Sequence, residues 1–180
     1  MNAEWYLMRG SGTVSLLLLT VVVALGIATS RRFRPSGLPL YVTTTVHRNA
    51  SLLAVAFLFI HVVTAVLDGD ARVPLAALVV PFASHWAPFW VGLGALALDL
   101  LAAVVVTSLL RKRLKHRTWR AIHWAAYAAW PLAYLHGLGA GTDAATAWML
   151  GVDVACLTAV GAALAWRLAA QPRPAAKGTV

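Results

Sequence analysis

The stretch TWRAIHWAAYAAWPLAYLHGLG, residues 118–139, carries a histidine near each end, His123 and His136. It is apolar and about as long as the roughly 20 residues that a helix needs to cross a bilayer. A second apolar stretch repeats this arrangement with His47 and His61. Because a histidine inside a bilayer is costly and rarely lacks a role, these four side chains are the first candidates for a functional site.

The composition predicts an integral membrane protein, because 61% of the 180 residues are hydrophobic. The single cysteine, Cys156, excludes a disulfide, a thiolate zinc site and an iron–sulfur cluster within one chain. The net charge of +9 would suit a nucleic-acid partner in a soluble protein. Here the basic residues lie between apolar segments, so we expect a lipid bilayer and no nucleic acid as the partner.

Five apolar segments predict an all-α membrane protein, a bundle of about five transmembrane helices in a single domain over residues 1–180. The expected spans are residues 14–28, 45–67, 88–110, 119–138 and 144–166. The first span is expected to be an uncleaved anchor, because cleavage would export the basic residues that follow it. The apolar segment 71–82 is too short to cross and is expected to lie at the outer interface.

Basic residues are distributed unevenly between the two sides of this bundle. Thirteen of them and no acidic residue fall on one side, in the loops at 31–37 and 111–120, at Arg48 and in the C-terminal tail. By the positive-inside rule this side is cytoplasmic, which places the N-terminus outside and the C-terminus in the cytoplasm. The expected location is the inner (plasma) membrane of the cell, which the chain crosses several times.

This topology makes the second and fourth spans parallel, so that the histidines fall at two levels. His47 lies level with His123 near the inner face, and His61 lies level with His136 near the outer face, about 20 Å away. We call these the inner pair and the outer pair. Structural zinc takes four protein ligands and catalytic zinc usually three, so two facing imidazoles suit haem iron better. Iron with two axial histidines carries electrons, because it has no open coordination position.

Two arginines, Arg48 and Arg120, are candidate partners for haem propionates at the inner level, by charge complementarity. The alternative is that they only orient the protein in the membrane. The facing of the fourth span is an open point, because 13 residues at 100° each leave His136 about 140° away from His123. Pro131 lies between them and can kink or rewind the helix.

The histidine spacings His-x13-His and His-x12-His, with Thr107-Ser108, a basic run, Trp119 and Tyr127, resemble the ferric reductase-like transmembrane domain. This superfamily includes NADPH oxidases, ferric reductases and the haem-binding membrane subunit of the periplasmic methionine sulfoxide reductase. The similarity covers about residues 47–143. It implies that the four histidines bind two b-type haems and that electrons pass from the cytoplasm to the outside.

The expected function is therefore that of a transmembrane b-type cytochrome that delivers electrons to an extracytoplasmic acceptor. No glycine-rich nucleotide-binding unit follows the last span, so the donor is expected to be a separate flavoprotein reductase or a quinol. Whether the chain is itself an enzyme stays open. One alternative is a quinol-oxidising subunit of a larger redox complex, and another is a transporter or assembly subunit whose histidines handle protons or a metal. Asp99, Asp153 and His85 have no assigned role.

Overall fold

A computed structural model describes residues 3–30, 40–69 and 73–169 of the chain. This part is helical and contains no strand, which confirms the predicted all-α class. The elements in chain order are α1 (Ala3–Ser30), α2 (Leu40–Leu67), the short 3₁₀ helix η1 (Leu75–Leu78), α3 (Pro88–Leu109), α4 (His116–His123), α5 (Ala125–Ala140) and α6 (Ala147–Ala169).

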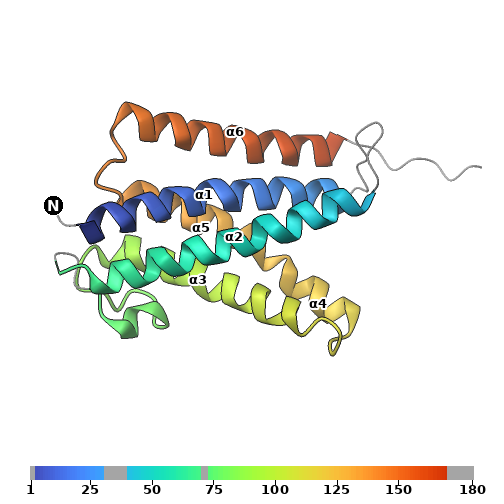
Figure 1. The fold of residues 1–180 in the computed structure, drawn as a ribbon, viewed down its shortest axis with the longest axis horizontal. Helices are drawn as coiled ribbons and strands as arrows, with labels where there is room; N and C mark the ends of the chain where they lie inside the picture. Colours follow the sequence, from blue (N-terminus) through green and yellow to red (C-terminus); the bar gives the residue numbers. More distant parts are fainter. Residues whose placement is uncertain (1–2, 31–39, 70–72, 170–180) are drawn as a thin grey trace, which may run out of the picture.

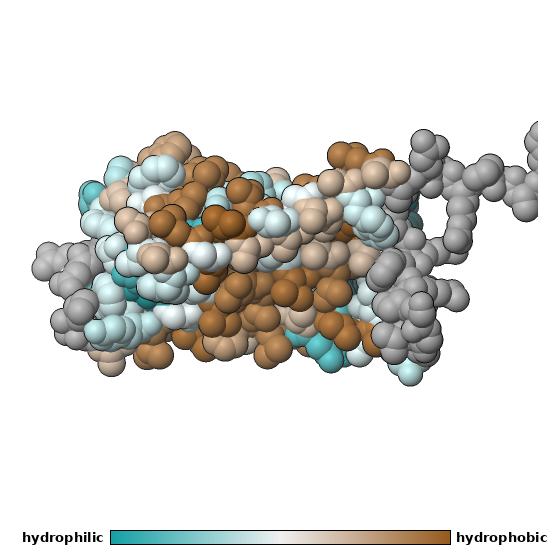
Figure 2. All heavy atoms as spheres, turned by 90° about the horizontal axis from the view of Figure 1, so that it is seen from above, coloured by the Kyte–Doolittle hydropathy of each residue, from teal (hydrophilic) through white to brown (hydrophobic). Residues whose placement is uncertain are grey.

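Four of the described helices, α1, α2, α3 and α6, are long and apolar enough to cross a membrane. They run along one long axis of the molecule, with α1 between α6 and the α2–α3 side (Figure 1). Apolar side chains cover much of the middle of the face in Figure 2, and hydrophilic residues lie nearer the ends. This distribution suits a bilayer around the middle of the bundle and water at both ends.

The predicted span 119–138 is not one continuous helix. α4 ends at His123 and α5 begins at Ala125, and Trp124 forms the turn between them. The backbone N–H of Tyr127 donates to the carbonyl oxygen of Trp124 at 3.0 Å, three residues back, so the chain is wound more tightly here than in an α-helix. With 8 and 16 residues, α4 and α5 reach the length of a span only together.

The bundle is built from two closely packed helix pairs, α1 with α2 and α3 with α5, and α1 also contacts α5 and α6. The core lies where α1 meets α5 and α6. The side chains of α1 that it buries recur every three or four residues, and they are Leu16, Leu19, Val23 and Ile27. They meet Trp130 of α5 and Cys156 of α6, and the Trp130 indole N–H donates to the Thr20 hydroxyl at 2.9 Å.

The segment before α3 lies across one end of the bundle, which we call the η1 end. Val73 and Ala77 are buried there against Ala83 and Val91, whereas Leu75 is exposed. The segment therefore has apolar side chains on both sides, as an interfacial segment has when lipid meets one of them.

The charged residues separate between the η1 end and the opposite end, where α4 lies. The run 111–120 is at the α4 end, and the ion pair between Arg9 and Asp143 is at the η1 end. The predicted basic loop at 31–37 and the tail residues Arg173 and Lys177 lie outside the described residues. The orientation across the membrane and the single-domain organisation therefore stay predictions.

Candidate functional site

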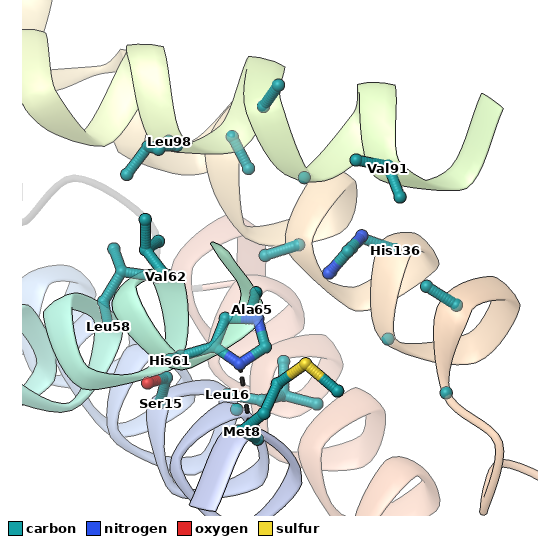
Figure 3. Close-up of a pocket in the computed structure, with 18 of the residues that line it drawn as sticks. Met8, Ser15, Leu16, Leu58, His61, Val62, Ala65, Val91, Leu98 and His136 are labelled. Atoms are coloured by element: carbon teal, nitrogen blue, oxygen red, sulfur yellow. Dashed lines mark hydrogen bonds between the residues drawn. The ribbon is translucent and has the colours of Figure 1, made fainter. Parts of the chain in front are cut away.

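The four histidines meet in the two pairs that their spacing predicts. The ring centroids of the inner pair, His47 and His123, are 6.4 Å apart, and those of the outer pair, His61 and His136, are 6.1 Å apart. The ring planes cross at 67° and 74°. Figure 3 shows His61 of α2 and His136 of α5 facing each other across a cavity.

The break at Trp124 changes the rotation about the helix axis between His123 and His136, which a regular helix would leave about 140° apart. A 3₁₀ turn has three residues per turn, so each residue adds about 20° more rotation than in an α-helix. This overwinding acts in the direction that closes the offset of about 140°. Pro131 lies inside α5 without ending it, so the interruption falls one residue after His123.

Three of the four rings are fixed by a bond from Nδ1 to a helix carbonyl. His61 Nδ1 lies 2.8 Å from the Met8 carbonyl oxygen and His47 Nδ1 lies 3.1 Å from that of Val22, both on α1. His136 Nδ1 lies 2.9 Å from the carbonyl oxygen of Trp90 on α3. Since a carbonyl only accepts, Nδ1 carries the proton in each ring, and Nε2 is left as the nitrogen with a lone pair for a metal.

Glycines on the neighbouring helices make this close approach possible. A Cβ at Gly12 would lie 2.9 Å from His61 Nδ1, and one at Gly94 would lie 2.7 Å from His136 Nδ1. At Gly26 a Cβ would lie 3.4 Å from Cε1 of His47. These supports were absent from the sequence prediction, although Gly12 and Gly26 are separated by 14 residues, the same step as the two histidines of α2.

His123 is supported differently from the other three. Its Nδ1 is buried and has no hydrogen-bond partner among the described residues, and the same is true of Trp119 Nε1. The Trp119 ring stacks on the imidazole, with centroids 4.9 Å apart and planes at 26°. The Arg111 guanidinium carbon lies 4.4 Å from the centre of the Trp119 ring. Aromatic stacking beside a cation therefore holds the His123 ring, in place of a carbonyl bond.

Two adjoining cavities lie inside the bundle. One of about 200 Å³ is lined by His61 and His136 of the outer pair. The second, of about 270 Å³, is lined almost entirely by apolar side chains, and neither histidine of the inner pair is among them. Leu58, Leu98 and Leu101 line both, so aliphatic side chains form the boundary between the two. The two cavities lie between the α1–α2 and α3–α5 pairs, the position that a flat group bridging the two pairs would occupy.

The distances within each pair fit one metal ion held between two imidazoles. A metal–nitrogen bond of about 2.0 Å and about 1.1 Å from nitrogen to ring centre place two trans imidazoles about 6.2 Å apart, centre to centre. The observed values are 6.1 and 6.4 Å. The described residues contain no cluster of three or more histidine, cysteine or acidic side chains that could hold a metal. A metal that brings its own four equatorial ligands, as haem iron does, therefore suits these pairs.

Comparison with known protein families gives a match over residues 11–134, to the family described as ferric reductase like transmembrane component. The chain belongs to this family. The resemblance drawn from the histidine spacing is thereby confirmed, and membership indicates transmembrane electron transfer. Comparison with curated proteins and with solved structures gave no match.

The charged residues of this ferric reductase-like chain are placed only partly as predicted. Arg48 and Arg120 are exposed, each close in sequence to a histidine of the inner pair. Arg9 was missed as a site residue, yet it is the only charged side chain among the described residues that line the cavity of the outer pair. Its guanidinium bonds Asp143 at 2.6 Å and also contacts the Thr142 hydroxyl, which ties α1 to the α5–α6 connection.

Three further polar residues that the sequence singled out lie away from the two pairs. Asp153 is buried on the face of α6 that packs against the core, and both its carboxyl oxygens lack a partner among the described residues. Asp99 is half-buried on α3, and His85 is exposed in the segment before α3. None of the three lines either cavity.

Proposed function

We propose that this ferric reductase-like protein is a membrane cytochrome that holds two b-type haems, one between His47 and His123 and one between His61 and His136. The observation that carries the proposal is the separation of each pair, 6.4 and 6.1 Å between ring centres, together with the Nδ1 bonds of three of the rings, which leave Nε2 as the nitrogen available to a metal. Haem bound there supplies a one-electron carrier with no open position on iron.

Residues around the two pairs would orient the ligands, separate the two haems and supply charge for the haem propionates. The carbonyl bonds fix the tautomer and orientation of His47, His61 and His136 and make these imidazoles more electron-rich ligands. Histidines on α2 that are 14 residues apart separate the two levels by about 21 Å along the helix axis. The leucines between the cavities exclude water from the path. Arg48 and Arg120 at the inner level and Arg9 at the outer level supply positive charge for propionates.

The direction of electron transfer is proposed to be outward. The basic run at the α4 end supports a cytoplasmic assignment of that end by the positive-inside rule, with the inner pair at the entry side. A flavoprotein reductase or a quinol would reduce the inner haem, and an extracytoplasmic acceptor would oxidise the outer one. We propose the inner (plasma) membrane of the cell as the location.

The test is haem content and spectrum of the purified protein. We expect two haems per chain by pyridine haemochrome, with the sharp alpha band of six-coordinate b haem after reduction. His61→Ala and His136→Ala should each remove the same haem, and His47→Ala and His123→Ala the other. The control is His85→Ala, because His85 is exposed and lies outside both cavities. Protein without haem, or paired variants that remove different haems, would overturn the proposal.

A further inference from the structure

Arg167, near the C-terminal end of α6, reaches across to the break between α4 and α5. Its guanidinium group donates to the Tyr127 hydroxyl at 2.8 Å. The guanidinium carbon lies 4.9 Å from the centre of the Trp124 ring and 5.5 Å from that of the Tyr127 ring. One side chain therefore contacts both aromatic residues of the turn that follows His123.

These two aromatic residues are the two ends of the turn. Trp124 has φ −65° and ψ −20°, which are values of a 3₁₀ helix, and its carbonyl accepts the backbone N–H of Tyr127. Residues three apart point in the same direction in a 3₁₀ helix, whereas in an α-helix they are about 60° apart. The two rings lie 5.3 Å apart, centre to centre. An arginine that contacts both rings therefore favours the tight turn over a regular helical one.

Orientation of the protein in the membrane is the simpler role for an arginine at the end of a span, but such a residue needs only to reach water. Arg167 is instead half-buried, and the Tyr127 ring to which it bonds packs against the core of the bundle. The backbone of α6 packs chiefly on α1, so Arg167 connects the C-terminal part of α6 to the start of α5. The turn is thus held from a helix that carries no histidine.

We propose that Arg167 is a positioning residue for the inner haem. By holding Trp124 and Tyr127 in the tight turn, it sets the direction in which His123 faces its partner. This inference rests on the proposed function. Each residue of the turn adds about 20° of rotation relative to an α-helix, and His123 immediately precedes the turn. The His123 ring is stacked on Trp119 of the same short helix, so the two rings turn together when α4 rotates against α5.

The test reads the geometry of the inner pair directly. The electron paramagnetic resonance spectrum of a ferric haem with two histidines depends on the angle between the imidazole planes, which is 67° in the inner pair. In a His61→Ala background, which keeps only the inner haem, we expect Arg167→Met to shift this spectrum and to speed haem transfer to apomyoglobin about three- to tenfold. Arg167→Lys keeps a cation and an N–H donor and should restore part of both. The matched control is Arg117→Gln, which removes one exposed charge at the same end of the bundle and should change neither.

The outcomes separate this inference from the proposed function. In a His47→Ala background, which keeps only the outer haem, Arg167→Met should leave the spectrum unchanged. An equal change at both haems, or an inner haem that Arg167→Met leaves unaltered, would overturn the inference alone. Wild-type protein without haem would overturn the proposed function itself. If Arg167→Met folds poorly, Tyr127→Phe removes the hydroxyl and keeps the ring; a smaller shift in the same direction is expected, and no shift would overturn the inference.

Discussion

Gly12→Ala provides a sharp test of the outer pair, because it changes one methyl group on a helix that contributes no ligand. The added Cβ would lie 2.9 Å from Nδ1 and 3.0 Å from Cε1 of His61, about half an ångström inside an ordinary contact. The methyl belongs to the α1 backbone and the ring cannot rotate freely, so the ring has to move. That movement breaks the 2.8 Å bond to the Met8 carbonyl, which lies one turn away on the same helix.

Two costs follow from this displacement. Forcing an extra methyl into a packed contact destabilises a protein by about 1–3 kcal/mol. Loss of the partner that orients a metal-ligating histidine typically weakens metal binding about 10- to 100-fold. We therefore expect Gly12→Ala to lower the affinity for the outer haem by about that factor, while the inner pair, whose support on α1 is a full 14 residues further along, keeps its haem.

The assay is the haem-to-protein ratio, followed by transfer of haem to an excess of apomyoglobin. We expect one haem to leave faster in Gly12→Ala. The matched control is Gly10→Ala on the same helix, where a Cβ would meet nothing within 4 Å and where alanine favours the helix by about 0.5–1 kcal/mol. Two firmly held haems in Gly12→Ala, or equal loss in Gly10→Ala, would contradict the placement of His61 against α1.

Three further predictions concern groups outside the pairs. Arg9→Gln and Asp143→Asn should each lower the free energy of unfolding in detergent by about 1–3 kcal/mol, because each breaks the same charged hydrogen bond. The double variant should lose little more than either single variant, and additive losses would refute the pairing. Trp130→Phe should cost less in a Thr20→Val background than in the wild type, by about 0.5–1.5 kcal/mol, because the hydrogen bond between the two side chains is then already lost and only the packing loss remains. Asp153→Leu should raise the melting temperature, since the buried carboxyl has no partner among the described residues; a lower melting temperature would indicate a partner.

The sequence was sufficient for the features that depend on chain length and hydropathy. A span must be about 20 apolar residues long, so the ends of α2, α3 and α6 were predicted to within five residues. The start of α1 was predicted wrongly, because this helix begins at Ala3, eleven residues before the expected span at 14–28. Two parallel spans with histidines 14 and 13 residues apart must present them at matching depths, so the pairing followed from topology. Both inferences use one-dimensional distances, which a helix fixes at about 1.5 Å per residue.

Rotation about the helix axis was harder to predict, because it accumulates small local deviations. The sequence drew attention to Pro131, whereas the interruption falls at Trp124, where the carbonyl bonds three residues forward and not four. The residues around Trp124 contain no sequence signal for this turn. The carbonyl supports on α1 and α3 were equally hidden, since a backbone oxygen carries no sequence signal. The glycines that make room for the histidine rings are the part of these supports that can be recognised in the sequence. Gly12 and Gly26 show the same 14-residue spacing as His47 and His61.

The packing of α2 links this geometry to cofactor binding. α2 carries one histidine of each pair, yet its extensive helix contact is with α1, and much of its surface is exposed. A helix that packs on one side only gains little from burial, so its position relative to α5 depends on what joins the two helix pairs. If the proposed haems are bound, the paired histidines supply that link. Haem binding should therefore stabilise the bundle as a whole, because ligand that binds only the folded state adds its binding free energy to the free energy of unfolding. Haem-depleted protein should then lose protection from hydrogen exchange first in α2, before α1 and α6.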